Sequence, residues 1–236
     1  MEDPYETHRS NVMGTLNILE AIRKFRNQVT GAVIASSDKA YGHSTKLPYT
    51  ENHPLRGLYP YDASKACTDI LAQSFAQSYR LPIGVLRCAN LYGPHDFHVS
   101  RLIPGTILSY LRDEQPVIRS DGSYRRDYLY IDDAVDAYLK FMDSIEKKQK
   151  KVIALNIGTD RAYSVQEVVR LIAELMNKPF KPTLLNNCKG EIHSQFLNSM
   201  QAKHSINWCA KTILEEGLMK TIESYQQTEK VSACVY

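Results

Sequence analysis

A tyrosine and a lysine four residues apart are the first candidates for chemistry in this sequence. Tyr61 and Lys65 lie in segment 60–79, which begins with proline. Proline suits the first turn of a helix, and apolar residues including Ile70 recur at helical spacing, so residues 60–79 are predicted to form a helix. Side chains four residues apart share a helix face. A cation beside a phenol favours the phenolate that a base requires, although tyrosine and lysine also meet by chance on amphipathic helices.

A second polar cluster follows a predicted buried strand. Residues 32–36 form a short apolar run, typical of a strand that is buried on both faces of a parallel sheet. Ser37, Asp38 and Lys39 come directly after it. Ligands bind beyond the carboxyl ends of strands in open α/β sheets, so this hydroxyl, carboxylate and ammonium are candidates for a site. An ordinary turn is the alternative interpretation.

Helices and strands are predicted to alternate along most of the chain, which indicates a parallel sheet covered by helices. Beyond residue 178 the chain contains prolines and a polar loop, so residues 179–236 are predicted to form a smaller lobe. The predicted helices are 5–26, 60–79, 101–112, 132–144, 164–176 and 214–226, and the predicted strands are 32–36, 83–87 and 152–157.

Composition narrows the class of protein. A length of 236 residues with 43% apolar residues suits one or two domains, and a formal charge of +3 is too small to indicate nucleic-acid binding. The basic run 147–151 is expected to be a solvated turn. Five cysteines without metal-ligand spacing indicate free thiols and no metal site. No apolar run approaches the roughly 20 residues of a membrane span, and the polar start is no signal peptide, so we expect a cytoplasmic protein.

Six motifs occur in a familiar order and spacing. They are Asn11-Val12-Met13-Gly14-Thr15, Ser36-Ser37-Asp38-Lys39-Ala40-Tyr41-Gly42, Tyr61-x-x-x-Lys65, Leu86-Arg87-Cys88-Ala89-Asn90-Leu91-Tyr92-Gly93-Pro94, Arg126-Asp127-Tyr128-Leu129-Tyr130 and Asn156-Ile157-Gly158. Together they resemble the extended short-chain dehydrogenase/reductase family, the NAD-dependent nucleotide-sugar epimerases and 4,6-dehydratases. One motif alone is weak, but six in register are specific.

The resemblance covers about residues 5–226 and implies an α/β fold. We expect a partial Rossmann-type doubly wound parallel sheet over residues 1–178, with substrate-side insertions at about 95–150. Residues 179–236 are expected to form a smaller C-terminal substrate-binding lobe.

The resemblance also implies roles for particular residues. Tyr61 would take the proton of the sugar 4-hydroxyl while hydride passes to NAD, Ser37 would hydrogen-bond that hydroxyl, and Lys65 would hold the nicotinamide ribose and lower the tyrosine pKa. The residues implied to contact NAD are Asn11, Ser36, Tyr61, Lys65 and Cys88. Those implied to contact the nucleoside-diphosphate sugar are Ser37, Asn90, Arg101 and Arg126. Arg126 is the strongest of these, because a guanidinium fork matches phosphate oxygens.

Asp38 and Lys39 bear on the type of reaction. Oxidation at C4 acidifies the C5 proton, so an acid at O6 and a base at C5 can eliminate water, whereas an epimerase needs neither. The resemblance to dehydratases of the CDP-glucose type implies that Asp38 is the acid and Lys39 the base. A lysine base must be largely neutral, and an ion pair with Asp38 or a solvated turn is an almost equal alternative.

The predicted function is therefore an NAD-dependent nucleotide-sugar 4,6-dehydratase, a lyase. A nucleotide-sugar 4-epimerase, an isomerase, is one alternative, and a non-catalytic nucleotide-sugar binding module is another. Cytidine, thymidine, uridine and guanosine diphosphate sugars all remain open as substrates.

One feature of the family is absent from the sequence. The family begins with a strand and a Gly-rich turn that contacts the dinucleotide pyrophosphate, and none of the eleven glycines forms such a motif. We therefore expect four opening strands to be missing, NAD to bind weakly or not at all, and activity to require the missing half. The strand after Gly31 would be an unpaired edge that invites association.

The resemblance also implies a homodimer through helices 5–26 and 60–79.

Overall fold

The computed structural model describes residues 3–147, 153–188 and 191–234. The basic run 147–151 lies outside these ranges except for Lys147. The helices are α1 (Pro4–His8), η1 (Arg9–Met13), α2 (Gly14–Lys24), η2 (Asp38–Tyr41), α3 (Pro60–Tyr79), α4 (Leu102–Leu111), α5 (Ile131–Glu146), α6 (Val165–Leu175), α7 (Met200–Ile206) and α8 (Leu214–Cys234). The strands are β1 (Ala32–Ser37), β2 (Ile83–Cys88), β3 (Asn90–Tyr92), β4 (Val117–Ile118), β5 (Arg125–Arg126), β6 (Tyr128–Tyr130), β7 (Ala154–Ile157), β8 (Tyr163–Ser164), β9 (Thr183–Leu184) and β10 (Ser194–Gln195).

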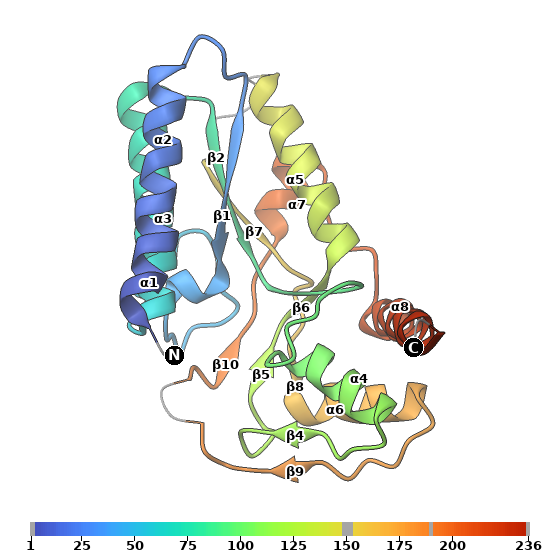
Figure 1. Ribbon diagram of the computed structural model, residues 1–236. Helices are drawn as coiled ribbons and strands as arrows, with labels where there is room; N and C mark the ends of the chain where they lie inside the picture. Colours follow the sequence, from blue (N-terminus) through green and yellow to red (C-terminus); the bar gives the residue numbers. More distant parts are fainter. Residues whose placement is uncertain (1–2, 148–152, 189–190, 235–236) are drawn as a thin grey trace.

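A parallel sheet of order β1-β2-β7 forms one half of the molecule, with α2 and α3 on one side and α5 on the other (Figure 1). This arrangement confirms the predicted helix-covered parallel sheet. Ser37 pairs with Cys88, and Cys88 pairs with Ile157, so the carboxyl ends of all three strands lie at one edge. Within the described part of the chain, β1 pairs with β2 alone and is an edge strand, as expected.

The second half of the molecule contains α4, α6, α8 and three small sheets (Figure 1). One of these sheets has the order β10-β5-β8, so segments from both sides of residue 178 share it. A capping box lies at the start of α6, where Ser164 accepts from the backbone of Glu167 and the Glu167 carboxylate accepts from the backbone of Ser164. In the described ranges, no helix is long and apolar enough to cross a lipid bilayer.

Three local predictions differ from the structure. The first predicted helix contains a π-helical turn at Arg9–Met13 and ends at Lys24. The loop after β2 contains a short strand, β3, which pairs with β6. Ile70 was expected on the buried face of α3 but is 53% exposed, because the buried face is formed instead by residues such as Ala72 and Phe75.

A buried ion pair fixes α3 against β2. Arg87 and Asp69 are 3% and 0% exposed, and the guanidinium donates to the two carboxylate oxygens at 2.8 and 2.9 Å. A third donor, Arg87 Nη1, reaches the Tyr41 hydroxyl at 2.8 Å, and that hydroxyl donates to Asn156 Oδ1 at 2.6 Å. The network therefore joins the helix that carries Tyr61 to the end of η2 and to β7.

Two of the six motifs meet in a second buried network. Asp127 is fully buried and accepts from the backbone N–H and the hydroxyl of Thr159, at 3.0 and 2.6 Å from Oδ1. Gly158 packs so closely that a Cβ atom there would lie 2.4 Å from Asp127 Oδ2. The close approach explains why glycine occupies this position, and it joins the chain after β7 to the start of β6.

Candidate active site

A cleft of about 930 Å³ opens beyond the carboxyl ends of β1 and β2. Every residue that the sequence analysis assigned to a site lines this cleft, with the exception of Asn11. These residues are Ser36, Ser37, Asp38, Lys39, Tyr61, Lys65, Cys88, Asn90, Arg101 and Arg126. The cleft thus collects side chains from β1, η2, α3, β2 and the second half of the molecule.

Tyr61 projects into the cleft from the first turn of α3 and remains 39% exposed. Burial of its hydroxyl is the main cause that raises the pKa of Tyr61, and the negative charge of Asp38 adds to the increase. The positive charge of Arg101 and a hydrogen bond with Ser37 act in the opposite direction. The phenol therefore lies near the Ser37 hydroxyl, and its burial favours the protonated form.

Lys65 lies near the Tyr61 ring without contacting its hydroxyl. The Lys65 ammonium is 5.9 Å from the centre of that ring and donates to the Ala35 carbonyl at 3.1 Å. Burial lowers the pKa of Lys65. In this arrangement burial raises the pKa of Tyr61 overall, so the lowering expected from Lys65 does not appear.

Ser37, Asp38 and Lys39 form one hydrogen-bonded turn at the tip of β1. Ser37 Oγ accepts from the backbone N–H of Lys39 at 3.2 Å and donates to Asp38 Oδ1 at 3.0 Å. Asp38 is 1% exposed, and its Oδ1 also lies 3.7 Å from Lys39 Nζ. No described residue hydrogen-bonds Asp38 Oδ2. The ion pair between Asp38 and Lys39 that the sequence analysis left open is present.

Ser36, Cys88 and Tyr138 line the part of the cleft next to Lys65. The Ser36 hydroxyl is buried and makes no hydrogen bond within the part of the chain that the structure describes. Burial raises the pKa of the Cys88 thiol to about 12, and a hydrogen bond with Tyr138 opposes this increase. Tyr138 was not predicted, because it lies on α5 and no strand-end motif marks it.

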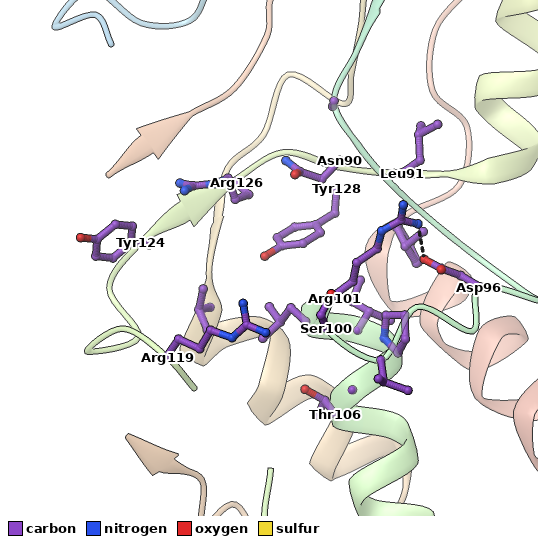
Figure 2. Close-up of a pocket in the computed structure, with 18 of the residues that line it drawn as sticks. Asn90, Leu91, Asp96, Ser100, Arg101, Thr106, Arg119, Tyr124, Arg126 and Tyr128 are labelled. Carbon is purple, nitrogen blue, oxygen red and sulfur yellow. Dashed lines mark hydrogen bonds and ion pairs between the residues drawn. The ribbon is translucent and has the colours of Figure 1, made fainter. Parts of the chain in front are cut away.

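Arginines surround the outer part of the cleft. Figure 2 shows Arg101, Arg119 and Arg126 around the ring of Tyr128. Arg101 pairs with Asp96 at 2.9 Å, and its side chain is 59% exposed. Arg119 is exposed and forms no ion pair with another described residue. Sequence reasoning missed Arg119, because it belongs to none of the six motifs.

Arg126 is more constrained than the sequence suggested. It is 8% exposed, and its Nη1 donates to the carbonyls of Arg125 and His193 at 2.9 and 3.2 Å. Its Nη2 lies 3.5 Å from Glu191 Oε2. Asn90, the remaining predicted substrate residue, donates to a backbone carbonyl at 3.1 Å on the same wall.

Asn11 is the predicted site residue that the structure does not bring to the cleft. Its side-chain amide donates to Ser64 Oγ at 2.9 Å, and its backbone carbonyl accepts from the Thr68 hydroxyl at 3.1 Å. These bonds attach η1 to α3. In the described ranges, no three His, Cys, Asp or Glu side chains are arranged to hold a metal ion.

Asp62, the neighbour of Tyr61 on α3, is expected to make the stability of the fold depend on pH. It is 6% exposed, and burial raises the pKa of Asp62 to about 6, although the nearby positive charge of Lys39 lowers it. Because an unfolded aspartate has a pKa of about 3.9, the folded state binds more protons between about pH 4 and pH 6. The contribution of Asp62 to stability is therefore full below pH 4 and is lost as the pH rises through 6.

We expect Asp62→Asn to remove this dependence. Relative to Asp62→Asn, the native chain should lose about 2 kcal/mol of unfolding free energy between pH 4 and pH 7. Urea unfolding of both proteins at the two pH values measures the difference. If the unfolding free energies of both proteins changed by the same amount between pH 4 and pH 7, the assignment of a raised pKa to Asp62 would be contradicted.

Comparison with known proteins identifies a family. The model of the NAD dependent epimerase/dehydratase family matches residues 1–158. The chain is 32% identical over 228 residues to the Arabidopsis thaliana trifunctional UDP-glucose 4,6-dehydratase/UDP-4-keto-6-deoxy-D-glucose 3,5-epimerase/UDP-4-keto-L-rhamnose-reductase RHM1, covering 94% of this chain and 33% of the relative. It is 29% identical over 223 residues to human dTDP-D-glucose 4,6-dehydratase, covering 92% of this chain and 62% of that protein. The chain thus spans from a third to about three fifths of the length of these curated relatives.

Solved structures share the fold. The UDP-glucose 4-epimerase of Thermotoga maritima, determined with UDP-glucose, has a TM-score of 0.87 and 31% identity, covering 96% of this chain and 72% of that one. The dTDP-glucose 4,6-dehydratase of Bacillus anthracis, determined with NAD, has a TM-score of 0.82 and 29% identity, covering 94% and 69%.

Proposed function

Because the chain belongs to the NAD dependent epimerase/dehydratase family, we propose that it is an NAD-dependent nucleotide-sugar 4,6-dehydratase. The observation that supports this most is the meeting of the Tyr61 phenol and the Ser37 hydroxyl in a cleft beside Asp38, whose Oδ2 atom is free of described partners. A base, a hydroxyl that orients the substrate and an acid are thereby available together. Both 4,6-dehydratases and 4-epimerases occur among the relatives, and the 4-epimerase reaction remains the second candidate.

The inner part of the cleft fits the nicotinamide end of NAD. Ser36 offers a buried hydroxyl that lacks a described partner, and the Lys65 ammonium is held beside it by the Ala35 carbonyl. These groups would hold the ribose of the nicotinamide, and the neighbouring Cys88 and Ala89 give a dry wall. When bound there, NAD supplies a hydride acceptor at the sugar C4 and returns the hydride later in the cycle.

The described residues fit the phosphates of NAD less well. The glycines with positive φ are Gly42 and Gly122, and neither opens an α-helix of the described chain. A dinucleotide pyrophosphate is usually held by a Gly-rich turn at a helix N-terminus. We therefore expect calorimetry on the 236-residue chain to show NAD binding weaker than micromolar. Micromolar binding would contradict this expectation.

The proton of the sugar 4-hydroxyl would leave through Ser37 and Tyr61. Ser37 would hydrogen-bond the hydroxyl, and the Tyr61 oxygen would accept the proton as the C4 hydride leaves. Since burial raises the pKa of Tyr61, the phenol must lose its own proton before it acts as a base. A closer approach of the Lys65 ammonium, which lies 5.9 Å from the ring, would favour that loss.

Elimination of water would use the other two residues at the tip of β1. The C5–H bond breaks, its electron pair forms the C5=C6 double bond, and the C6–O bond breaks. Asp38 would give the departing hydroxyl a proton, so that water leaves. Lys39 would first pass one of its protons to Asp38 across their ion pair, which makes Asp38 the acid, and the neutral Lys39 amine would then take the C5 proton. A 4-epimerase would use Tyr61 and Ser37 without this step.

The diphosphate of the substrate would bind in the outer part of the cleft. Arg119 is the best-placed donor, because it is exposed and forms no ion pair with another described residue. Arg101 would have to exchange Asp96 for a phosphate oxygen, and Arg126 would have to release part of its backbone contacts. Guanidinium groups suit phosphate oxygens, so the three arginines favour a nucleoside diphosphate sugar.

A homodimer is proposed through the outer faces of α1, α2 and α3. Large apolar side chains on these helices and on η1 remain exposed, namely Tyr5, Met13, Ile18, Ile70 and Tyr79. Exposed apolar patches are typical of protein interfaces. We also propose a cytoplasmic location, because the described cysteines Cys67, Cys88, Cys188 and Cys209 are free thiols.

The test uses the full chain with millimolar NAD and a panel of CDP-, dTDP-, UDP- and GDP-linked hexoses, with products identified by NMR. Formation of a 4-keto-6-deoxy sugar from one nucleotide sugar is the expected result. Inversion at C4 alone would favour the epimerase. Saturable binding of a nucleotide sugar without any conversion would contradict catalysis by the 236-residue chain on its own and favour a non-catalytic binding module.

A further inference from the structure

The Lys39 side chain is held by a residue 156 positions away in the sequence. Its Nζ donates to Gln195 Oε1 at 2.9 Å. Lys39 lines the cleft and its side chain is 24% exposed, whereas Gln195 is fully buried. The hydrogen-bond acceptor thus belongs to the interior, and the ammonium that it holds faces the cleft.

The backbone of Gln195 is fixed on both sides. It pairs with Arg126 through the β10 and β5 strands, and its carbonyl accepts from the backbone N–H of Asp127 at 3.2 Å. The next residue, Phe196, accepts from the backbone N–H of Tyr49 at 2.9 Å. Gln195 Oε1 is therefore a rigid point against which Lys39 is placed.

A glutamine at a fully buried position is costly unless its polar atoms are used. Burial of an amide without a hydrogen bond costs free energy. The amide of Gln195 also interacts with the Tyr49 hydroxyl, although the distance to Nε2 is too long for a regular hydrogen bond. The carbonyl end has one side-chain partner in the described chain, Lys39. The contact of the carbonyl end with Lys39 and that of the amide with Tyr49 both give a reason for glutamine there, and the contact with Lys39 is the one that faces the cleft.

We infer that Gln195 is a positioning residue for Lys39 in the elimination step, an inference that rests on the proposed function. Gln195 holds the Lys39 nitrogen in the cleft, 3.7 Å from Asp38 Oδ1, and leaves Asp38 Oδ2 free for proton transfer. Removal of the C5 proton depends on the position of Lys39, whereas departure of hydride from C4 depends on Tyr61 and Ser37. Loss of Gln195 therefore affects water elimination and spares hydride transfer.

The first experiment needs no substrate. Amine labelling of the full chain, followed by mass spectrometry, measures the reactivity of Lys39. In Gln195→Leu we expect Lys39 to label about tenfold faster, because a hydrogen bond to a charged group is lost. Gln195→Glu keeps the acceptor oxygen and adds a negative charge, so Lys39 should label no faster than in the native chain. Lys140, held by Asp136 at 2.9 Å and similarly exposed at 33%, is the internal reference.

The second experiment separates the two chemical steps with the nucleotide sugar that the panel identifies. Gln195→Leu should slow release of water about tenfold while hydride transfer changes less than about twofold. In a Lys39→Met background, Gln195→Leu should cause no further loss, because the two residues act as a unit. Thermal unfolding of each variant verifies that it is folded, and Gln195→Met replaces Gln195→Leu if the latter is not.

Unchanged labelling of Lys39 in Gln195→Leu would overturn the inference. The inference would also be overturned if Gln195→Leu slowed hydride transfer and water release equally. It would likewise fail if Gln195→Leu slowed water release further in the Lys39→Met background. If the native chain transfers no hydride from any sugar, the proposed function fails, whereas the labelling result still decides whether Gln195 positions Lys39.

Discussion

Tyr61→Phe is expected to lower turnover of the nucleotide sugar by about 10²- to 10⁴-fold, the range for loss of a general acid–base group. The substitution keeps the ring against the cleft wall and removes only the hydroxyl that meets Ser37. Because the ring remains in place, affinity for the nucleotide sugar should change little. The loss should therefore appear in kcat, measured by product formation under saturating substrate.

Tyr59→Phe is the matched control. Tyr59 precedes α3, lies outside the wall of the cleft, and is 39% exposed, the same fraction as Tyr61. We expect Tyr59→Phe to retain native turnover. If Tyr61→Phe kept more than about a tenth of native turnover, Tyr61 would not be the base.

Asp69→Asn is expected to destabilise the fold by about 3–5 kcal/mol, because it leaves a buried guanidinium without its counter-charge. Arg87 is 3% exposed and makes its two shortest carboxylate contacts with Asp69. The remaining partners of Arg87 include the Tyr41 hydroxyl, which cannot neutralise a charge. Urea unfolding at pH 7 measures the loss of unfolding free energy.

Two comparisons sharpen this prediction. Asp143→Asn breaks an exposed ion pair with Lys147 at 2.7 Å and should cost less than about 1 kcal/mol. The double variant Asp69→Leu with Arg87→Met removes both buried charges and should recover much of the stability lost in Asp69→Asn. Equal effects of Asp69→Asn and Asp143→Asn would show that the buried pair is not a main support of α3.

The helices and strands that carry the site could be predicted because their signals are local. The helix α3 was correctly predicted from proline at position 60 and the apolar spacing after it. The strand β1 was correctly predicted from the apolar run 32–36. Residues at the ends of neighbouring parallel strands then had to lie together. For this reason Ser37 and Cys88 could be placed at one cleft before any coordinates were known.

Electrostatics and long-range contacts were not predictable in the same way. The pKa of Tyr61 depends on how deeply α3 packs, so proximity to Lys65 gave the wrong direction. Gln195 and Arg119 carry no motif. The pairing of β10 with β5 brings Gln195 to Lys39, and the pairing of β4 with β9 precedes Arg119 at the cleft. The π-helical turn at Arg9–Met13 likewise had no signal in the apolar spacing.

The most direct test of the account is a single-turnover measurement with a nucleotide sugar that carries deuterium at C4. We expect slower conversion of the deuterated sugar than of the ordinary one, and, for the 4,6-dehydratase, a product in which NMR locates the deuterium at C6. Equal single-turnover rates, with the deuterium never leaving C4, would contradict the claim that Tyr61 and Ser37 remove a proton from the sugar alcohol as hydride departs.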